Sequence, residues 1–292
     1  MDALLVALGV ICGTLIWLGN RRILDGGGRA VAFGFWVALS GAVISGILAL
    51  ALGQPLDDPV VWGLGALVAL GYGVGYCLIA MHCLRIGPAG PTVAMNNMGL
   101  VWPVALGALW LQPRPFTNEL GAGLVLVLGS LIAFAFNRPT DGNPANTRSV
   151  SLRWLIWAVL CWVLSGLCMT GQLVASIHDP AKPLALICAF NCISAAILAA
   201  AILRLGQTQL RGNELIFGSV NGALQVAIAF AVLTVLPRLG PELVFPFVIA
   251  GPAVIMLLLA RVLYRERLSR TACLACTLGV AGLVALSLAM TK

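Results

Sequence analysis

Long apolar segments alternate with short polar stretches along almost the whole chain. Each of ten segments holds about 20 residues, the length that a helix needs to cross the hydrocarbon core of a bilayer. Lipid cannot satisfy exposed backbone groups, so each segment is predicted to be a helix. The pattern therefore predicts an all-α integral membrane protein with ten transmembrane helices. The predicted helices cover residues 2–19, 30–52, 60–84, 88–111, 119–136, 154–174, 183–203, 214–236, 241–263 and 271–290.

The two halves of this pattern repeat each other at a constant offset of 153 residues. Gly13 falls on Gly166, and the turn Arg85-Ile-Gly-Pro88 falls on Arg238-Leu-Gly-Pro241. Each half holds five apolar segments, and an odd number requires the second copy to be inverted in the membrane. The sequence thus predicts a first five-helix repeat over residues 1–140, a connecting loop over 141–153 and a second, inverted repeat over 154–292.

Composition and charge agree with the membrane prediction and set an orientation. Hydrophobic residues make up 61% of the chain and charged residues 9%, against about 25% charged in a soluble domain. The net charge of +7 is spread over loops rather than gathered on one face, which argues against nucleic-acid binding. Thirteen Lys and Arg lie in or beside the loops of one side and four on the other. The positive-inside rule predicts a multi-pass cell (inner) membrane protein with both termini outside.

Polar residues inside the predicted spans are few, and each is a candidate for contact with a substrate. Asn96 and Asn97 lie near the middle of the fourth segment, and Tyr72 and Gln225 are equivalent positions of the third and eighth. Hydrogen bonding between helices is the alternative for these residues, and an interfacial anchor is the alternative for Trp102. The predicted substrate-binding residues are Tyr72, Asn96, Asn97, Trp102, Gln172, Asn221 and Gln225.

All ten acidic residues lie in loops or at the ends of predicted spans. Glu242, at the start of the ninth segment, is the nearest candidate for coupling to a proton, and capping of a helix N-terminus is the alternative. Cys273-Leu-Ala-Cys276 matches a redox or metal spacing, but it lies in an apolar segment with no second pair and no nearby histidine, which favours packing. We find no metal site, nucleophile triad or phosphate-binding loop. The sequence therefore predicts no cofactor, no metal and no enzyme activity.

Five glycines crowd the third segment, and two of them, Gly71 and Gly75, are four residues apart. They form one narrow stripe on a helix, which favours close packing against a neighbouring helix. A flexible gate is the alternative interpretation.

The chain resembles the drug/metabolite transporter superfamily, in particular its ten-helix EamA-type members. The resemblance rests on the duplicated five-helix units, on the Arg-Ile-Gly-Pro-like turns, and on Arg-Glu-Arg-Leu at 265–268 followed by Gly279 and Gly282. Pro113 departs from the family pattern, in which a glutamate stands there. The basic first loop is similar to that of the rhamnose and glucose/ribose branches. Many ten-helix members keep both termini in the cytoplasm, opposite to the orientation predicted from charge. The resemblance implies a central cavity lined by helices 1, 3, 4, 6, 8 and 9.

These observations predict a secondary transporter that moves a small polar metabolite by alternating access, with its site between the repeats. A predicted wall of amides, a phenol and aromatic rings without fixed charge favours an uncharged or zwitterionic substrate. Sugar uptake, amino-acid export and facilitated movement of amphipathic compounds stay open, as do coupling to a proton or to no ion. The lipid bilayer is the predicted environment of a monomer or homodimer. An intramembrane enzyme and a non-transporting membrane subunit are the alternatives of another class.

Overall fold

The computed structural model describes residues 1–86, 92, 95–107, 117–135, 151–207, 209, 211–263 and 270–290. These residues are mostly helical and include no strand, as the apolar pattern predicts. The helices are α1 (Asp2–Asp25), α2 (Ala30–Ala51), α3 (Pro59–Ala69), the π-helix η1 (Leu70–Ala80), α4 (Met81–Ile86), the 3-10 turn η2 (Met98–Leu100), α6 (Val101–Leu106), α7 (Asn118–Ala135), α8 (Leu152–His178), α9 (Pro183–Arg204), α10 (Gly212–Leu239), α11 (Pro241–Leu263) and α12 (Arg270–Met290).

Two described spans depart most from their predictions. The first helix was expected to stop at residue 19 but continues to Asp25. The third span is an α-helix only at its two ends, because η1 occupies its middle. The fourth predicted span is described only in part, and most of the loop 141–153 and the Arg-Glu-Arg-Leu motif lie outside the described residues.

Six described stretches of helix are long and apolar enough to cross a membrane, with mean hydropathy between 1.8 and 2.4. Large apolar side chains are exposed along these stretches, among them Ile11, Ile47 and Ile216. Such outward-facing side chains are costly in water and favourable in lipid. Helices α7, α11 and α12 contribute shorter apolar stretches. The protein is therefore a helical protein suited to a membrane.

Local sequence accounts for several helix ends. The Asp58 carboxylate accepts a hydrogen bond from the Val60 N–H, and Pro59 occupies the first position of α3, where its missing N–H costs nothing. Helices α2 and α9 end in turns of the same geometry. In each, a glycine with positive φ (Gly53, 67°; Gly206, 64°) lies between a leucine and a glutamine. A side chain would strain both turns, which explains glycine there.

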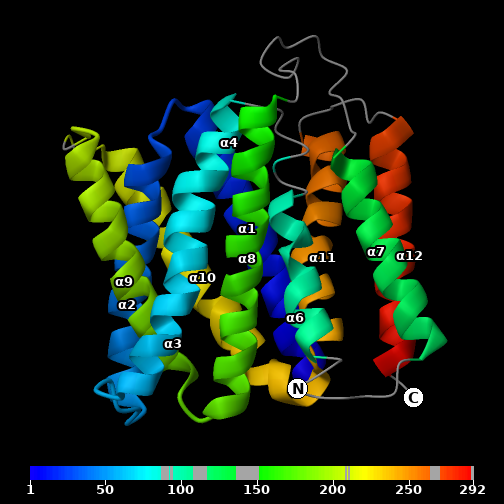
Figure 1. Cartoon of the computed structure of the whole chain (residues 1–292), viewed down its shortest axis with the longest axis horizontal. Coiled ribbons are helices and arrows are strands. Elements are labelled where there is room, and N and C mark those ends of the chain that lie inside the picture. Colours follow the sequence, from blue (N-terminus) through cyan, green and yellow to red (C-terminus); the bar gives the residue numbers. More distant parts are fainter. Residues whose placement is uncertain are drawn as a thin grey trace.

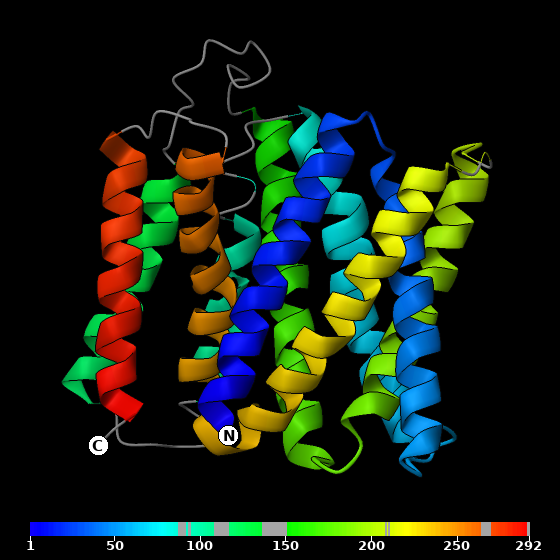
Figure 2. The ribbon, with the colours of Figure 1, turned by 180° about the vertical axis from the view of Figure 1, so that it is seen from behind.

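The helix contacts can be divided into two groups, which we treat as two bundles, and the helices can be located in Figures 1 and 2. In the first bundle, α1 packs against α10 and α11, and α10 packs against α2. In the second bundle, α8 packs against α3, η1, η2 and α6, and α9 packs against α3 and η1. The closest contact between the bundles is α2 with α9. On the other flank α7 packs against α12, and both contact α11. We call these the α1 bundle and the α8 bundle.

Small residues allow the helices to approach closely within each bundle. A Cβ on Gly71 would lie 2.3 Å from the Cβ of Cys168, and one on Gly75 would lie 2.8 Å from the Cβ of Leu164. Both glycines thus pack against α8, as the stripe predicts. In the α1 bundle, a Cβ on Gly13 would lie 2.7 Å from the Cγ of Pro252 on α11.

The largest apolar cluster lies where α10 ends and α11 begins. It joins Leu173 of α8, Val232 and Leu236 of α10 and Val244 of α11, all at most 3% exposed. This cluster closes the contact between the bundles at the end of the molecule that holds the N-terminus (Figure 2).

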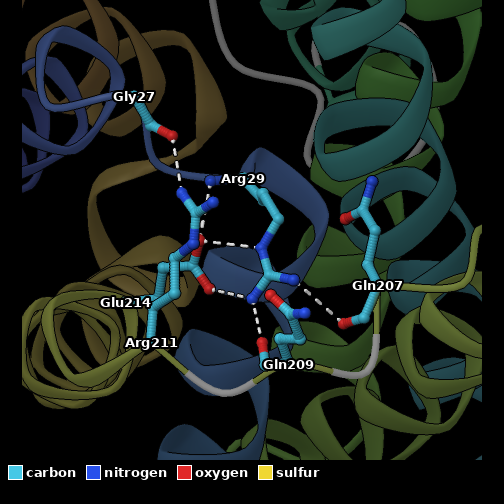
Figure 3. A network of polar contacts seen from close by, with 6 residues as sticks. All are labelled: Gly27, Arg29, Gln207, Gln209, Arg211 and Glu214. Atoms are coloured by element: carbon cyan, nitrogen blue, oxygen red, sulfur yellow. Dashed lines mark hydrogen bonds and ion pairs between the residues drawn. The ribbon is translucent and has the colours of Figure 1, made fainter.

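At the start of α2, a network of ionic and polar groups joins this helix to α10 and to the segment that precedes α10 (Figure 3). The Arg29 guanidinium donates to both oxygens of Glu214, at 3.0 and 2.7 Å, and its backbone N–H donates to the same carboxylate at 2.8 Å. It also donates to the carbonyl oxygens of Gln207 and Gln209. Nearby, Arg211 donates to the carbonyl of Gly27. We call this set the Arg29 network.

A second network lies at the other end of α2 and at the start of α9. The Lys182 ammonium contacts the carboxylates of Asp58 at 2.9 Å and Asp179 at 2.8 Å. The Gln54 side-chain oxygen accepts from the backbone N–H groups of Leu184 and Ala185, which are the orphan donors of the first turn of α9. We call this set the Lys182 network.

Candidate substrate-binding cavity

A cavity of about 270 Å³ lies between the two bundles. The α1 bundle contributes residues of α1, α2, α10 and α11, and the α8 bundle contributes residues of η1, α4, α8 and the segment 96–97. Its wall combines apolar side chains with two smaller sets. The aromatic set is Trp17, Phe33, Tyr72 and Tyr76; the polar set is Asn20, Asn96, Asn97, Ser165, Asn221 and Gln225.

Five of the seven predicted substrate-binding residues line this cavity. They are Tyr72, Asn96, Asn97, Asn221 and Gln225. They come from η1, from the described part of the fourth span and from α10, so residues up to about 150 positions apart meet at one cavity.

Trp102 and Gln172, although both are described, are not among the residues that line the cavity. Trp102 is 40% exposed and packs across Gly166, with its ring centroid 5.4 Å from that of Trp162. Gln172 points along its own helix, where its amide lies 3.9 Å from the Cys168 sulfur. Both are helix-packing residues of α8 and α6 in this arrangement.

Glu242 also lies away from the cavity lining, in the first turn of α11. It is 4% exposed, and its carboxyl folds over Gly240, where a Cβ would clash with it. Gly240 has φ of 84°, so this turn requires glycine for its backbone as well as for the carboxyl. The position fits a carboxylate at a helix N-terminus, which the helix dipole favours.

Three polar side chains of the cavity are bonded to one another. The Asn20 amide donates to the Tyr76 hydroxyl at 2.9 Å, and the Asn221 amide donates to the Asn20 side-chain oxygen at 3.1 Å. Asn20 and Asn221 belong to the α1 bundle and Tyr76 to the α8 bundle. This hydrogen bond between Asn20 and Tyr76 therefore crosses from one bundle to the other beside the cavity.

The segment that carries Asn96 and Asn97 is held by side chains of α8. Ser165 donates to the Asn96 carbonyl at 2.8 Å, and the Trp162 indole donates to the Met98 carbonyl at 3.2 Å. The segment tightens into the 3-10 turn η2 at this point, just before Pro103, so these carbonyls have partners outside their own helix. The Asn96 amide donates to the Asn97 side-chain oxygen over a long 3.4 Å. The turn and its anchors present the two amides to the cavity.

Gln225 and Tyr72 have unused hydrogen-bonding capacity. The Gln225 side-chain oxygen is buried and has no hydrogen-bond partner among the described residues. The Tyr72 ring stacks on Tyr76, with 6.0 Å between ring centroids, and meets Phe190 edge-on at 6.2 Å. These contacts fix the direction of the phenol while its hydroxyl borders the cavity.

The sequence analysis did not identify Asn20 and Tyr76. The predicted first helix ends at residue 19, so Asn20 is assigned to the loop, whereas α1 continues past it. Tyr76 lies four residues after Tyr72, and this spacing is the signal that could have indicated a shared face. Trp17 and Phe33 carry no signal that separates a cavity wall from an ordinary apolar contact.

The chemistry of the cavity wall is uncharged in the part of the chain that the structure describes. None of the described residues that line the cavity is Asp, Glu, His, Lys or Arg. Among the described residues, no group of three or more His, Cys, Asp or Glu is placed to hold a metal ion. Two cysteines, Cys77 and Cys168, border the cavity as free thiols.

Comparison with known proteins identifies a shared fold but no family. No family model and no curated protein matches the chain. Solved structures do match, among them one described only as "Crystal structure of protein". The two share 18% sequence identity and superpose with a TM-score of 0.75, over 99% of this chain and 96% of that one. At this identity the likeness shows that the whole chain shares its fold, and nothing about activity.

Proposed function

We propose that this chain is a secondary transporter that moves a small polar metabolite across a cell (inner) membrane by alternating access. The observation that carries the proposal is the cavity between the bundles, whose polar groups lie among otherwise apolar helices. Polar groups inside a membrane are costly, so they mark a substrate path more often than a packing contact. Substrate sites of such proteins lie near mid-membrane between two structural units.

Part of this proposal is that ten spans form two inverted repeats, residues 1–140 and 154–292. Under the offset of 153, α1 corresponds to α8, α2 to α9, the span α3–η1–α4 to α10, the η2–α6 segment to α11, and α7 to α12. Under the same offset, the helix–helix contacts of the first half correspond to those of the second half. Helix α1 packs against α10 and α11, while α8 packs against η1 and α6. The pairs α2–α9 and α7–α12 correspond to themselves, as contacts on a twofold axis must.

Local geometry at equivalent positions supports the repeats. Gly53 and Gly206 are 153 residues apart, and both have positive φ in Leu-Gly-Gln turns. The close contact of Gly13 with Pro252 corresponds to that of Gly166 with Gly99, where a Cβ on Gly99 would lie 2.9 Å from the Gly166 nitrogen. Related sequence thus makes related contacts in both halves.

The proposed orientation follows from direction and charge. Helix α1 begins at the end of the molecule where α8 and α12 end (Figures 1 and 2). The Arg29 network lies at the opposite end, which we assign to the cytoplasm by the positive-inside rule. The cavity reaches Ala30 and Met81 near that end. The apolar cluster closes the other end, so we assign the structure to a cytoplasm-facing state.

Alternating access in this architecture is a rocking of the α1 bundle against the α8 bundle about the α2–α9 and α7–α12 contacts. The Asn20–Tyr76 hydrogen bond crosses between the bundles and would have to change during that motion. At the equivalent positions of the second half stand Leu173 and Ala229, both buried and apolar. The proposed gates are therefore polar at one end and apolar at the other.

The test is uptake by purified protein in liposomes, with a panel of labelled sugars, amino acids and other uncharged metabolites. Asn97→Ala and Gln225→Ala are expected to abolish uptake while the protein still elutes as a single folded species. Gln172→Ala is the matched control, because it removes a span amide that does not line the cavity, and it should transport normally. Normal uptake by both cavity variants would refute the proposed site.

Coupling and class are tested in the same liposomes. An imposed proton gradient should accelerate uptake in the wild type but not in Glu242→Gln if Glu242 carries the coupling proton, whereas gradient-independent uptake identifies a facilitator. We propose transport rather than intramembrane catalysis because the described cavity lining has no Asp, Glu, His, Lys or Arg to move protons. Liposomes that accumulate no member of the panel would favour a non-transporting membrane subunit.

A further inference from the structure

The polar groups of the cavity divide into a bonded set and an available set. Asn20, Tyr76 and Asn221 form a chain of hydrogen bonds at 2.9 and 3.1 Å. The Ser165 hydroxyl is bonded to a backbone carbonyl. Each of these four side chains already has a protein partner, but the Tyr76 O–H, the Asn221 side-chain oxygen and the second N–H of Asn20 make no hydrogen bond among the described residues.

The available set is small. The Gln225 side-chain oxygen has no partner among the described residues, and no hydrogen bond of the Tyr72 hydroxyl is found among them. Asn97 receives only the 3.4 Å contact from Asn96, and its own N–H groups are unbonded in the described part of the chain. Among the lining residues, Gln225, Asn97 and Tyr72 therefore keep the most hydrogen-bonding capacity, and two of these three are carboxamides.

The rest of the described wall is apolar. It includes four aromatic rings, two methionines and the aliphatic side chains of Ile228 and Val248. The cavity volume of about 270 Å³ is slightly below the roughly 300–1,000 Å³ that is usual for drug-sized ligands. The occupant is a small molecule with most of its surface apolar or aromatic.

This wall disfavours two of the substrate classes that the sequence leaves open. An ammonium or carboxylate group would be buried without an opposite charge among the described residues, which is costly. A sugar brings about five hydroxyl groups, and each one left unpaired in the cavity costs about 1–3 kcal/mol. Gln225, Asn97 and Tyr72, the groups with the most free capacity, cannot pair with all of them.

Carboxamides and aromatic rings together recognise one kind of neutral molecule well. The side chains of Asn and Gln pair in a bidentate manner with the adjacent donor and acceptor on the edge of a heterocyclic base. Aromatic side chains stack on the faces of such rings, and this stacking does not require charge. Both elements line this cavity, with Gln225 in the α1 bundle and Asn97 and Tyr72 in the α8 bundle.

We propose that the cavity takes an uncharged heteroaromatic ring with an amide-like edge, of the nucleobase type, with this edge on Gln225 and Asn97. The inference rests on the proposed transport function and narrows its substrate class. A ligand held from both bundles would also be released when the bundles rock apart, as a transported molecule must be.

The experiment measures thermal stabilisation of the purified full-length protein by uracil, adenine and hypoxanthine. D-ribose, L-rhamnose, L-alanine and choline form the comparison panel. A ligand that binds only the folded state raises the melting temperature in proportion to its affinity. We expect stabilisation by at least one base at millimolar concentration and by none of the other compounds. Stabilisation by a sugar, alanine or choline, or by no base, would overturn the proposal.

Variants locate the binding site. Gln225→Met keeps the side-chain length without the amide and should weaken base binding about tenfold or more, since one bidentate pair contributes about 1–3 kcal/mol. Gln172→Met is the matched control and should bind like the wild type. If Gln225→Met does not fold, Asn97→Leu provides the same test from the other bundle. Unchanged base affinity in whichever of these variants folds would refute the proposed contacts.

The result is separable from the transport proposal. Base binding that depends on Gln225, in protein that accumulates no base in liposomes, would uphold the ligand class and refute transport. Gln225-dependent uptake of a sugar would uphold transport and refute the ligand class.

Discussion

The Arg29 and Lys182 networks each hold the start of one helix against the start of a neighbouring helix. They lie at opposite ends of the molecule and are buried to very different degrees. In each, the cationic residue that precedes α2 or α9 pairs with a carboxylate at the start of a neighbouring helix, Glu214 of α10 or Asp58 of α3. Arg29 and Lys182 are 153 residues apart, as are Gln54 and Gln207. The positions correspond, but the chemistry has diverged.

Burial decides how much each network contributes to the stability of the fold. The Glu214 side chain is 1% exposed and accepts three hydrogen bonds from Arg29, whereas the Lys182 and Asp58 side chains are each 25% exposed. A buried carboxylate depends on its partner, while an exposed one is solvated and its ion pair is screened. The comparison indicates that the α1 bundle is fixed firmly at one end and the α8 bundle loosely at the other.

The largest effect is expected from Arg29→Met. This change leaves the Glu214 carboxylate buried without its main partner, which costs about 3 kcal/mol or more. The melting temperature of the purified protein in detergent should fall by several degrees. Arg22→Met is the control, since Arg22 is exposed on α1, and it should melt like the wild type. Equal melting of the two variants would contradict the proposed importance of burial.

A double variant separates pairing from burial. Arg29→Met combined with Glu214→Leu removes both charges, so no unpaired carboxylate remains in the interior. We expect the double variant to melt above the Arg29→Met single variant, with a coupling free energy of about 1 kcal/mol or more in a double-mutant cycle. Additive destabilisation by the two changes would show that they act independently.

Lys182→Met should lower the melting temperature less than Arg29→Met does. The carboxylates of Asp58 and Asp179 remain in contact with water after the change, so neither becomes a buried unpaired charge. Added salt should reduce the difference between Lys182→Met and the wild type, because exposed pairs are screened. A loss as large as that of Arg29→Met would reverse the comparison.

The smallest effect is a dependence on pH. Hydrogen bonds to Asp179 and Asp58 raise the pKa of Lys182 to about 12, and the hydrogen bond from Lys182 lowers the pKa of Asp58. The stabilisation of the fold by Lys182 is fully present below its unfolded pKa of about 10.4 and is lost as pH rises towards 12. The stabilisation by Asp58 is lost as pH falls below about 3.9. The difference in melting temperature between wild type and Lys182→Met should be constant from about pH 5 to 9 and should shrink above pH 10. A difference that grows above pH 10 would contradict this assignment.

The sequence predicted the class of fold well because one signal, the apolar segment of about 20 residues, is sufficient for helices in lipid. The same signal placed the first helix boundary too early, because Asn20 and the two arginines after it continue the helix as polar residues. The π-helical turn in η1 could not be predicted, since nothing in its Gly-rich sequence separates it from an α-helix of the same composition.

The candidate site was predictable only in part. Tyr72, Asn97 and Gln225 could be selected because polar side chains in an apolar span are few. The same selection also included Gln172 and Trp102 among the predicted substrate-binding residues. The Gln172 amide points along its own helix, and Trp102 covers Gly166. The side of a helix that faces a cavity depends on how the helix is rotated in the bundle, and residue type does not report that rotation.

The two thiols beside the cavity make the protein vulnerable to a particular class of inhibitor. Cys77 and Cys168 come from different helices of the α8 bundle, and both border the space between the bundles. Small neutral mercurials that enter the cavity should bind these sulfurs and lock the chain in one conformation, whereas maleimides, which need a thiolate, should react slowly because an apolar setting disfavours that charged form. Bulky or charged thiol reagents should be excluded and leave it active, so the reagent that inhibits reports the size and polarity of the entrance.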